Sequence, residues 1–165
     1  MSDGLELTLR TALIGIGATL MIDLWGMLVQ RLFGVRPLNF GMLGRWLGHM
    51  PRGQFVHENI ATASPVRGEL AIGWIAHYTI GVVFAALLLA IKGLAWMRQP
   101  TLPPALVFGM ITVVFPFFTM QPGMGLGIAS AKASRPNLAR LRSLGTHTVF
   151  GFGLYASALL LSWYV

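Results

Sequence analysis

Four long apolar stretches dominate the sequence and constrain the fold more than any other feature. A helix needs about 20 residues to cross the roughly 30 Å of hydrocarbon in a bilayer. The predicted bounds of the stretches are about 11–29, 70–91, 102–120 and 143–163. Unpaired backbone groups are costly in lipid, so helices are expected for all four. We therefore predict an all-α integral membrane protein, a four-transmembrane-helix bundle that forms a single membrane domain over residues 1–165.

Charged residues are scarce and unevenly placed. They make up 10% of the chain, against about 25% in soluble domains. The net charge is +7, but the arginines and lysines gather in the connections between the apolar stretches. Lipid headgroups explain this placement better than nucleic acid, so we expect the bilayer as a partner and no nucleic acid. The candidate contacts to anionic headgroups are Arg45, Arg52, Lys132, Arg135, Arg140 and Arg142.

The distribution of basic residues also predicts an orientation. The first and third connections are rich in arginine, whereas the second connection and both ends of the chain are poorer. Cytoplasmic loops carry the excess of Lys and Arg in membrane proteins. Both basic connections are therefore expected in the cytoplasm and both termini on the other side. The first stretch lacks a clear cleavage site, so it should remain in the mature protein. The first connection contributes Arg31, Arg36, Arg45, Arg52 and Arg67.

The first connection contains a short amphipathic pattern. Apolar residues recur at helical spacing between positions 39 and 50, and Pro51 follows them. Arginine and tryptophan within this pattern suit the headgroup layer. We predict an interfacial helix over residues 39–50, followed by a polar loop to Glu69.

Ionisable side chains inside apolar stretches are the best clues to function. Asp23, His77 and His147 are such residues, and they usually face the bundle interior and have partners. At about 1.5 Å of rise per residue, they lie roughly 9, 10 and 6 Å from the cytoplasmic ends of their stretches. Gln121 closes the third stretch on the same side. The sequence therefore predicts one polar layer made of Asp23, His77, His147 and Gln121.

A metal ion or protons are the first two candidates for what this layer binds. Neutral imidazoles with a carboxylate suit zinc, iron, manganese or nickel, whereas thioethers from Met120 or Met124 would favour copper. His49, in the first connection, is a further candidate ligand. Histidine titrates near neutral pH, so Asp23 with a histidine is also suited to relay or sense protons. Either activity would fit an accessory of transport or sensing.

Two alternatives stay open beside these. His77 and His147 are each followed one turn later by a glycine, Gly81 and Gly151, which could make space for haem in a membrane redox protein. Small residues at this spacing are also the usual device by which membrane helices approach closely, with polar residues as structural glue. A non-catalytic structural or assembly protein would need nothing more.

The sequence carries no motif that indicates an enzyme. We find no nucleophile elbow, zinc-protease motif or paired catalytic carboxylates, and no catalytic residue is assigned. Four helices are few for an alternating-access transporter, because repeats usually supply more spans. A homo-oligomer would ease that objection.

Five sequence motifs, in the same order along the chain, are shared with a known family. The chain resembles the short bacterial inner-membrane proteins known only as a domain of unknown function, through MIDLWG, LGRWLGHMPRG, GWIAHYTIG, MQPGMGLG and SLGTHTVFGFGLY. The resemblance covers nearly the whole chain. It implies four membrane helices in the inner membrane and no established activity. With the charge pattern above, an inner-membrane location predicts both termini in the periplasm. The resemblance also places Asp23, His49, His77, Gln121 and His147 within the shared motifs.

Overall fold

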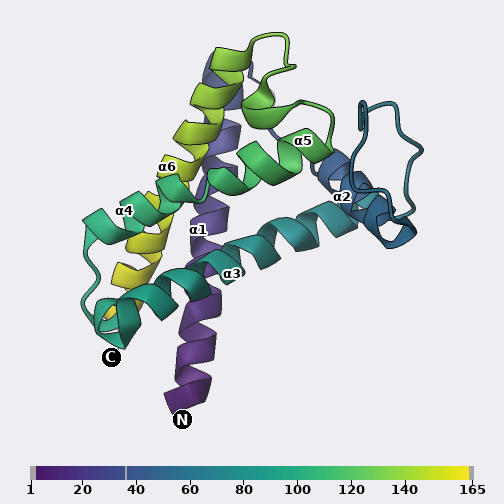
Figure 1. Ribbon diagram of the computed structural model, residues 1–165. Helices are drawn as coiled ribbons and strands as arrows, with labels where there is room; N and C mark the ends of the chain where they lie inside the picture. Colours follow the sequence, from purple (N-terminus) through teal and green to yellow (C-terminus); the bar gives the residue numbers. More distant parts are fainter. Residues whose placement is uncertain (1–2, 36, 164–165) are drawn as a thin grey trace. The chain divides into compact units, whose positions relative to one another are not determined.

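Every regular element is helical in the computed structural model, which describes residues 3–35 and 37–163. Arg36, part of the predicted charge pattern, lies outside the described residues. Figure 1 shows the elements along the chain from purple to yellow. The longer helices are α1 (Asp3–Phe33), α2 (Phe40–His49), α3 (Glu69–Arg98), α4 (Leu102–Ile111) and α6 (Pro136–Ser162). The short ones are η1 (Met50–Arg52), η2 (Pro116–Met120), α5 (Gln121–Gly123) and η3 (Ile128–Ser130).

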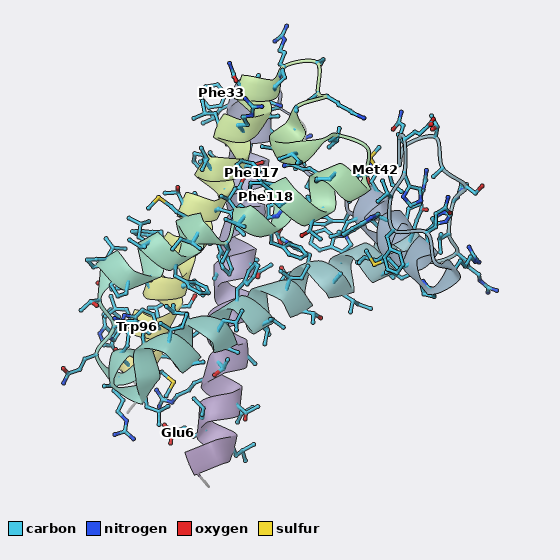
Figure 2. The ribbon with its side chains drawn as sticks, viewed as in Figure 1. Glu6, Phe33, Met42, Trp96, Phe117 and Phe118 are labelled. Atoms are coloured by element: carbon cyan, nitrogen blue, oxygen red, sulfur yellow. The ribbon has the colours of Figure 1, made fainter. Side chains whose placement is uncertain are left out.

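Four helical segments of the described chain are long and apolar enough to cross a membrane, as predicted. They are Gly4–Phe33, Glu69–Arg98, Leu102–Gly123 and Pro136–Ser162. At most a third of each span is buried inside the protein. Large apolar side chains fill the remaining surface; Phe33 and Phe118, labelled in Figure 2, are 72% and 59% exposed. Soluble monomers rarely expose apolar surface on this scale, so four long apolar helices with this surface indicate a multi-pass membrane protein.

Helix α2 forms where the amphipathic pattern predicted a helix. The Asn39 side chain caps it by accepting a hydrogen bond from the Met42 backbone N–H, at 3.4 Å. Pro51 then lies within η1, and Gly53 ends that turn with a φ of 78°, a conformation that suits glycine. The helix is therefore confirmed to within a residue at each end. Its position at the membrane surface stays a prediction.

The third span leaves the α-helical conformation after Ile111 and becomes π-helical from Pro116 to Met120, and α3 is interrupted near its end. Proline has no backbone N–H and cannot complete the regular helical ladder. The chain adopts a π-helical turn over η2, in which the Gln121 N–H donates to the Pro116 carbonyl. Gly93 breaks α3 with a φ of 76° and a ψ of 173°. Such interruptions release backbone groups that are tolerated in membranes only when other groups satisfy them.

The described chain packs as two compact units. The helix unit contains the described parts of Met1–Pro37, Tyr78–Thr112 and Gly145–Val165. The loop unit contains Leu38–His77 and Val113–Leu144. The boundaries fall inside α3 and α6, so each of these helices contributes residues to both units.

Small residues bring the helices of the helix unit into close contact. Gly15 of α1 lies against Val82 of α3, and Gly109 of α4 lies against Gly151 of α6. These contacts surround an apolar core from α1, α3, α4 and α6. Trp96 belongs to this core at 6% exposure and donates its Nε1–H to the Thr101 carbonyl, at 3.1 Å (Figure 2). The buried core residues are Ile14, Ala18, Ala85, Leu88, Leu89, Trp96, Met97, Ala105, Phe150, Leu154 and Ala158.

The loop unit has a separate core around α2. Leu43, Trp46, Ile60 and Met124 form its buried cluster. Gly44 of α2 meets the Glu69 backbone, where any side chain would collide with the start of α3. The connection after η1 has little regular structure, yet it is fixed: the Trp46 Nε1–H donates to the Phe55 carbonyl at 2.8 Å. This connection is therefore part of a packed unit.

Candidate functional site

Asp23 has a tyrosine partner in the helix unit. Its carboxylate accepts a hydrogen bond of 2.9 Å from the Tyr78 hydroxyl, which joins α1 to α3. Both side chains are half-buried. The expectation that an intramembrane carboxylate has a partner is therefore met, by a residue that was not among the sequence-based candidates. Its signal was a hydroxyl within an apolar stretch, directly after His77.

His147 has a threonine partner in the same unit. Its Nδ1 lies 2.7 Å from the Thr112 hydroxyl oxygen, which joins α6 to the end of α4. The Thr112 hydroxyl in turn donates to the Gly109 carbonyl. Thr112 is buried and is a second functional candidate that sequence reasoning missed. A hydroxyl in the middle of an apolar stretch was again the available signal.

This chain of hydrogen bonds assigns the proton on His147. A carbonyl oxygen can only accept, so the proton of the Thr112 hydroxyl points at Gly109. The hydroxyl oxygen then accepts from His147, which places the proton on Nδ1. The Nε2 of a neutral imidazole in this form carries a lone pair. The arrangement thus presents one basic nitrogen in a fixed orientation.

His77 and Gln121 lie in the loop unit. The His77 ring packs against Phe40, with the ring centroids 4.5 Å apart, and against Trp74 at 6.0 Å. The Gln121 side chain is buried and donates from Nε2 to the Ser143 hydroxyl at 3.3 Å. Its Oε1 is buried without a hydrogen-bond partner among the described residues. Buried polar atoms are normally paired, so such an atom calls for an explanation.

The predicted polar layer is thus divided between the two units. Asp23 and His147 belong to the helix unit, whereas His77 and Gln121 belong to the loop unit. A single layer of all four residues stays a prediction. Over the described residues, no group of three or more His, Cys, Asp or Glu side chains could hold a metal ion.

The additional metal-ligand candidates also lie in the loop unit. His49 is buried and its Nε2 lies 2.9 Å from the Ser64 carbonyl oxygen. Met124 is buried in the core of this unit, and Met120 packs against that core. His57, whose loop looks polar in sequence, is equally buried.

Two of the candidate headgroup arginines have protein partners. Arg45 forms a paired contact with Glu69, whose hydrogen bond raises the pKa of the Arg45 guanidinium. Arg140 donates to the Ala129 carbonyl at 2.9 Å and to the Asn137 side chain at 3.1 Å. The remaining candidates are exposed, which leaves them as the basic side chains that a headgroup can reach. They are Arg52, Lys132, Arg135 and Arg142.

The glycines that could make room for haem face other helices. A side chain at Gly81 would collide with the Thr19 hydroxyl of α1. A methyl group at Gly151 would lie 2.8 Å from the Ala105 carbonyl oxygen. The positions one turn after His77 and His147 are therefore helix contacts, as the alternative of close helix packing predicts.

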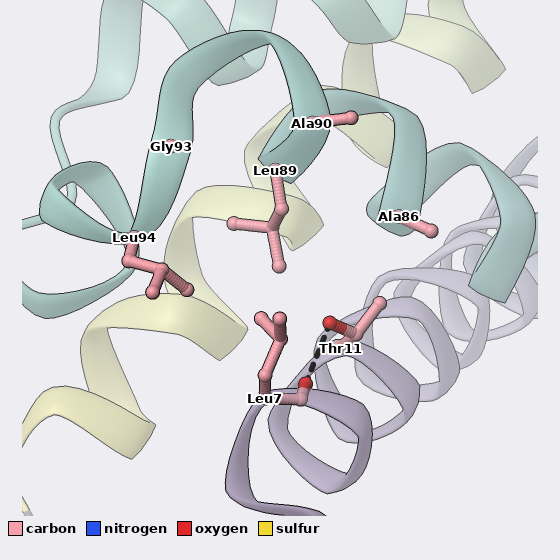
Figure 3. Close-up of a pocket in the computed structure, with 7 residues that line it drawn as sticks. All are labelled: Leu7, Thr11, Ala86, Leu89, Ala90, Gly93 and Leu94. Atoms are coloured by element: carbon pink, nitrogen blue, oxygen red, sulfur yellow. Dashed lines mark hydrogen bonds between the residues drawn. The ribbon is translucent and has the colours of Figure 1, made fainter. Parts of the chain in front are cut away.

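A cavity of about 270 Å³ lies between α1 and α3 in the helix unit. Figure 3 shows that Leu7, Thr11 and Leu89 point into it, beside the break at Gly93. The Thr11 hydroxyl donates to the Leu7 carbonyl at 2.7 Å, shown as the dashed line. Its lining contains no ionisable side chain, so this cavity offers an apolar surface and no acid-base chemistry.

The four apolar helices and the paired polar residues within them define a class, that of helical multi-pass membrane proteins. Within that class the chain belongs to the family described as "Protein of unknown function (DUF2938)", whose model matches residues 12–161. The match confirms the resemblance expected from the five motifs. No curated protein and no solved structure matches the chain.

Proposed function

We propose that this membrane protein binds protons within its spans, at His147 and Asp23, as an accessory of transport or sensing. Histidine and aspartate are the residue types that proton pathways use inside membranes. The observation that carries the proposal is the hydrogen bond between the Thr112 hydroxyl and His147 Nδ1. It fixes the ring and leaves Nε2 as the proton acceptor.

Asp23 supports the same function from α1. A carboxylate in an apolar span is retained where it has a partner and a role, and the Tyr78 hydroxyl holds this one in place. His77 of the second span and Gln121 of the third span are further candidate polar groups. We propose that these two residues also take part in proton binding.

Protons are favoured over the other ligands considered. A metal site with several ligands is not favoured, because the described residues contain no group of three or more His, Cys, Asp or Glu side chains that could hold an ion. Haem binding is not favoured, because neighbouring helices fill the space at Gly81 and Gly151 where the macrocycle would lie. A structural or assembly role is the second candidate, favoured by the close glycine contacts of the helix unit.

The proposed setting rests on the motif resemblance and on the distribution of charge. We place the protein in the bacterial inner membrane, with α2 at the cytoplasmic surface and both termini in the periplasm. The basic connections support this orientation. Exposed apolar side chains on all four spans would contact lipid. Gly15 and Gly17 pack against Val82 and Ser157 of the same chain, so a homo-oligomer would need another surface.

Nitrogen NMR tests the proposal. The full chain, labelled with ¹⁵N on histidine, is reconstituted in lipid nanodiscs and followed against pH, and His147 is identified by the signal lost in His147→Asn. We expect the Nδ1–H form at high pH and reversible protonation of Nε2 as the pH falls. Thr112→Val removes the hydroxyl that accepts from Nδ1 and should raise the Nε2–H fraction of the neutral ring.

Thr119→Val is the matched control, because Thr119 is an exposed threonine of the same span. It should leave the His147 signals unchanged. A His147 ring that never takes a second proton while the protein stays folded would refute proton binding. If His147→Asn then lowers thermal stability, the structural role is the better account.

A further inference from the structure

His57 is a buried side chain that no described residue satisfies with a hydrogen bond. It lies in the connection between η1 and α3, yet its residue is only 7% exposed. Both ring nitrogens are buried and have no hydrogen-bond partner in the described part of the chain. The backbone around it is fixed, since its N–H donates to the Gly123 carbonyl at 2.9 Å. Since nearly all buried polar groups are paired in folded proteins, this ring points to a missing ligand.

A second imidazole lies beside it. The rings of His49 and His57 are 5.0 Å apart between centroids, at an interplanar angle of 73°. His49 Nε2 is 2.9 Å from the Ser64 carbonyl oxygen. Because a carbonyl can only accept, the His49 proton is on Nε2 and the lone pair is on Nδ1. Metal-binding histidines commonly use one ring nitrogen for such a carbonyl contact and the other for the ion.

The apolar cluster of the same unit is rich in soft sulfur side chains. Met42, Met50, Met120 and Met124 all belong to it or pack against it. Met50 follows His49 in the chain, and the Met124 carbonyl accepts from the Ile60 N–H three residues after His57. Glu69, a carboxylate of this unit, is engaged by Arg45 at 2.7 Å.

We propose that His49 and His57 bind a monovalent copper ion in the loop unit. A metal–imidazole bond is about 2.0 Å long, so two rings that share one ion lie within a few ångströms of each other, as these rings do. Imidazole and thioether donors suit copper in its reduced state. A single positive charge also loses less hydration on burial than a double charge would. The site shares no residue with the proposed proton-binding set of Asp23, His77, Gln121 and His147.

Competition for cuprous ion tests the site. The full chain in detergent is titrated anaerobically, with ascorbate present, against a chromophoric chelator of Cu⁺. We expect one ion per chain. His57→Leu should weaken binding by more than about tenfold, since even loss of an outer-sphere partner costs that much. His49→Ala should have a similar effect.

His57→Leu is chosen because it should fold. Within the described chain the ring makes no hydrogen bond that leucine would lose, so its thermal unfolding should match the wild type. His77→Leu, the same exchange in the same unit, should keep the copper. If His57→Leu fails to fold, the wild type is examined by X-ray absorption, where two imidazole ligands are expected on the copper.

Three results would overturn the assignment. Binding no tighter than that of His57→Leu would mean that water alone fills the site. Binding that survives in His57→Leu but is lost in His77→Leu would place the copper elsewhere. Tighter binding of zinc than of Cu⁺, tested with Zn²⁺ under the same conditions, would show that the pair is not a copper site.

Discussion

At the scale of single residues, Arg45 organises the first connection. Its Nε and Nη2 donate to the two oxygens of Glu69, at 2.8 and 2.7 Å. Its Nη1 lies within 3.4 Å of the carbonyl oxygens of Ile60, Ala61 and Ala63. A planar guanidinium can serve a carboxylate and several carbonyls at once, whereas an ammonium cannot reproduce this fork. Arg45 thus ties α2, the connection and the start of α3 together.

Replacing Arg45 with lysine tests this role. Arg45→Lys keeps the charge but loses the bonds to the carbonyls, so residues 60–69 should open more readily. Hydrogen exchange followed by mass spectrometry should show faster exchange in that segment. Arg52→Lys is the control, because Arg52 is exposed. Equal protection in the two variants would mean that charge alone holds the connection.

The candidate site residues differ in how readily they can be chosen from the sequence alone. Asp23 and His147 could be chosen as candidates because an ionisable side chain in an apolar stretch usually has a partner or a role. Tyr78 and Thr112 could not be assigned as their partners, since that depends on which helix faces lie against each other. His57 was hidden for another reason: its loop is polar in sequence, and the tertiary contacts that hold it beside residues 123–125 are not visible in the sequence.

At the scale of elements, close contacts of glycines set the helix packing. Without a hydrophobic force between helices in lipid, small residues allow the close approach that stabilises their association. Gly151 lies where α6 meets α4, whereas a methyl group added at Gly145, on the same helix, would meet nothing within 4 Å. Both glycines lie in α6, but only Gly151 lies against another helix.

Alanine at these two glycines should have opposite effects. Gly151→Ala places a methyl 2.8 Å from the Ala105 carbonyl oxygen and should destabilise the protein by about 1–3 kcal/mol. Gly145→Ala has open space and should stabilise by up to about 1 kcal/mol through helix propensity. Thermal unfolding in detergent measures both. A Gly151→Ala variant that unfolds no more easily than the wild type would show that the α4–α6 contact is not tight.

The sequence predicted the presence of the helices more accurately than the residues at which they begin and end. The spans were predictable because an apolar stretch of about 20 residues is the length that crosses a bilayer as a helix. The start of α2 was predictable at residue 39, since the cap that the Asn39 side chain supplies is a local interaction. Observed helices run past the predicted ends, for example α1 to Phe33 and not residue 29. Polar residues beyond the hydrocarbon carry no apolar signal, although they can continue a helix.

At the scale of the whole molecule, charge predicts a topology that the fold alone cannot give. The chain contains no cysteine, so single cysteines can report on each connection. Gln54, Gln99 and Ser134 are exposed positions in the first, second and third connections. Under the proposed orientation, the second connection faces the periplasm.

Impermeant thiol labelling of intact bacterial cells checks this orientation. Gln99→Cys should be labelled in intact cells, because its connection is expected outside. Gln54→Cys and Ser134→Cys should be labelled only after the membrane is opened, because the positive-inside rule keeps their basic loops in the cytoplasm. The reverse pattern would invert the topology, and labelling of all three in intact cells would contradict a membrane-spanning arrangement with sided loops.

The backbone bonds at His57 and Ile60 have a consequence for how the protein is made. Their acceptors are the carbonyls of Gly123 and Met124, at 2.9 and 3.1 Å. A ribosome produces these acceptors only after the second and third spans have been synthesised, because the chain emerges from its N-terminus. Until then the first connection lacks these two bonds and the Trp46 contact with Gly123. Only the contacts within residues 39–69, such as the Trp46–Phe55 bond, can hold it, so we expect a nascent chain to be more open to proteases in this segment until the third span has been made.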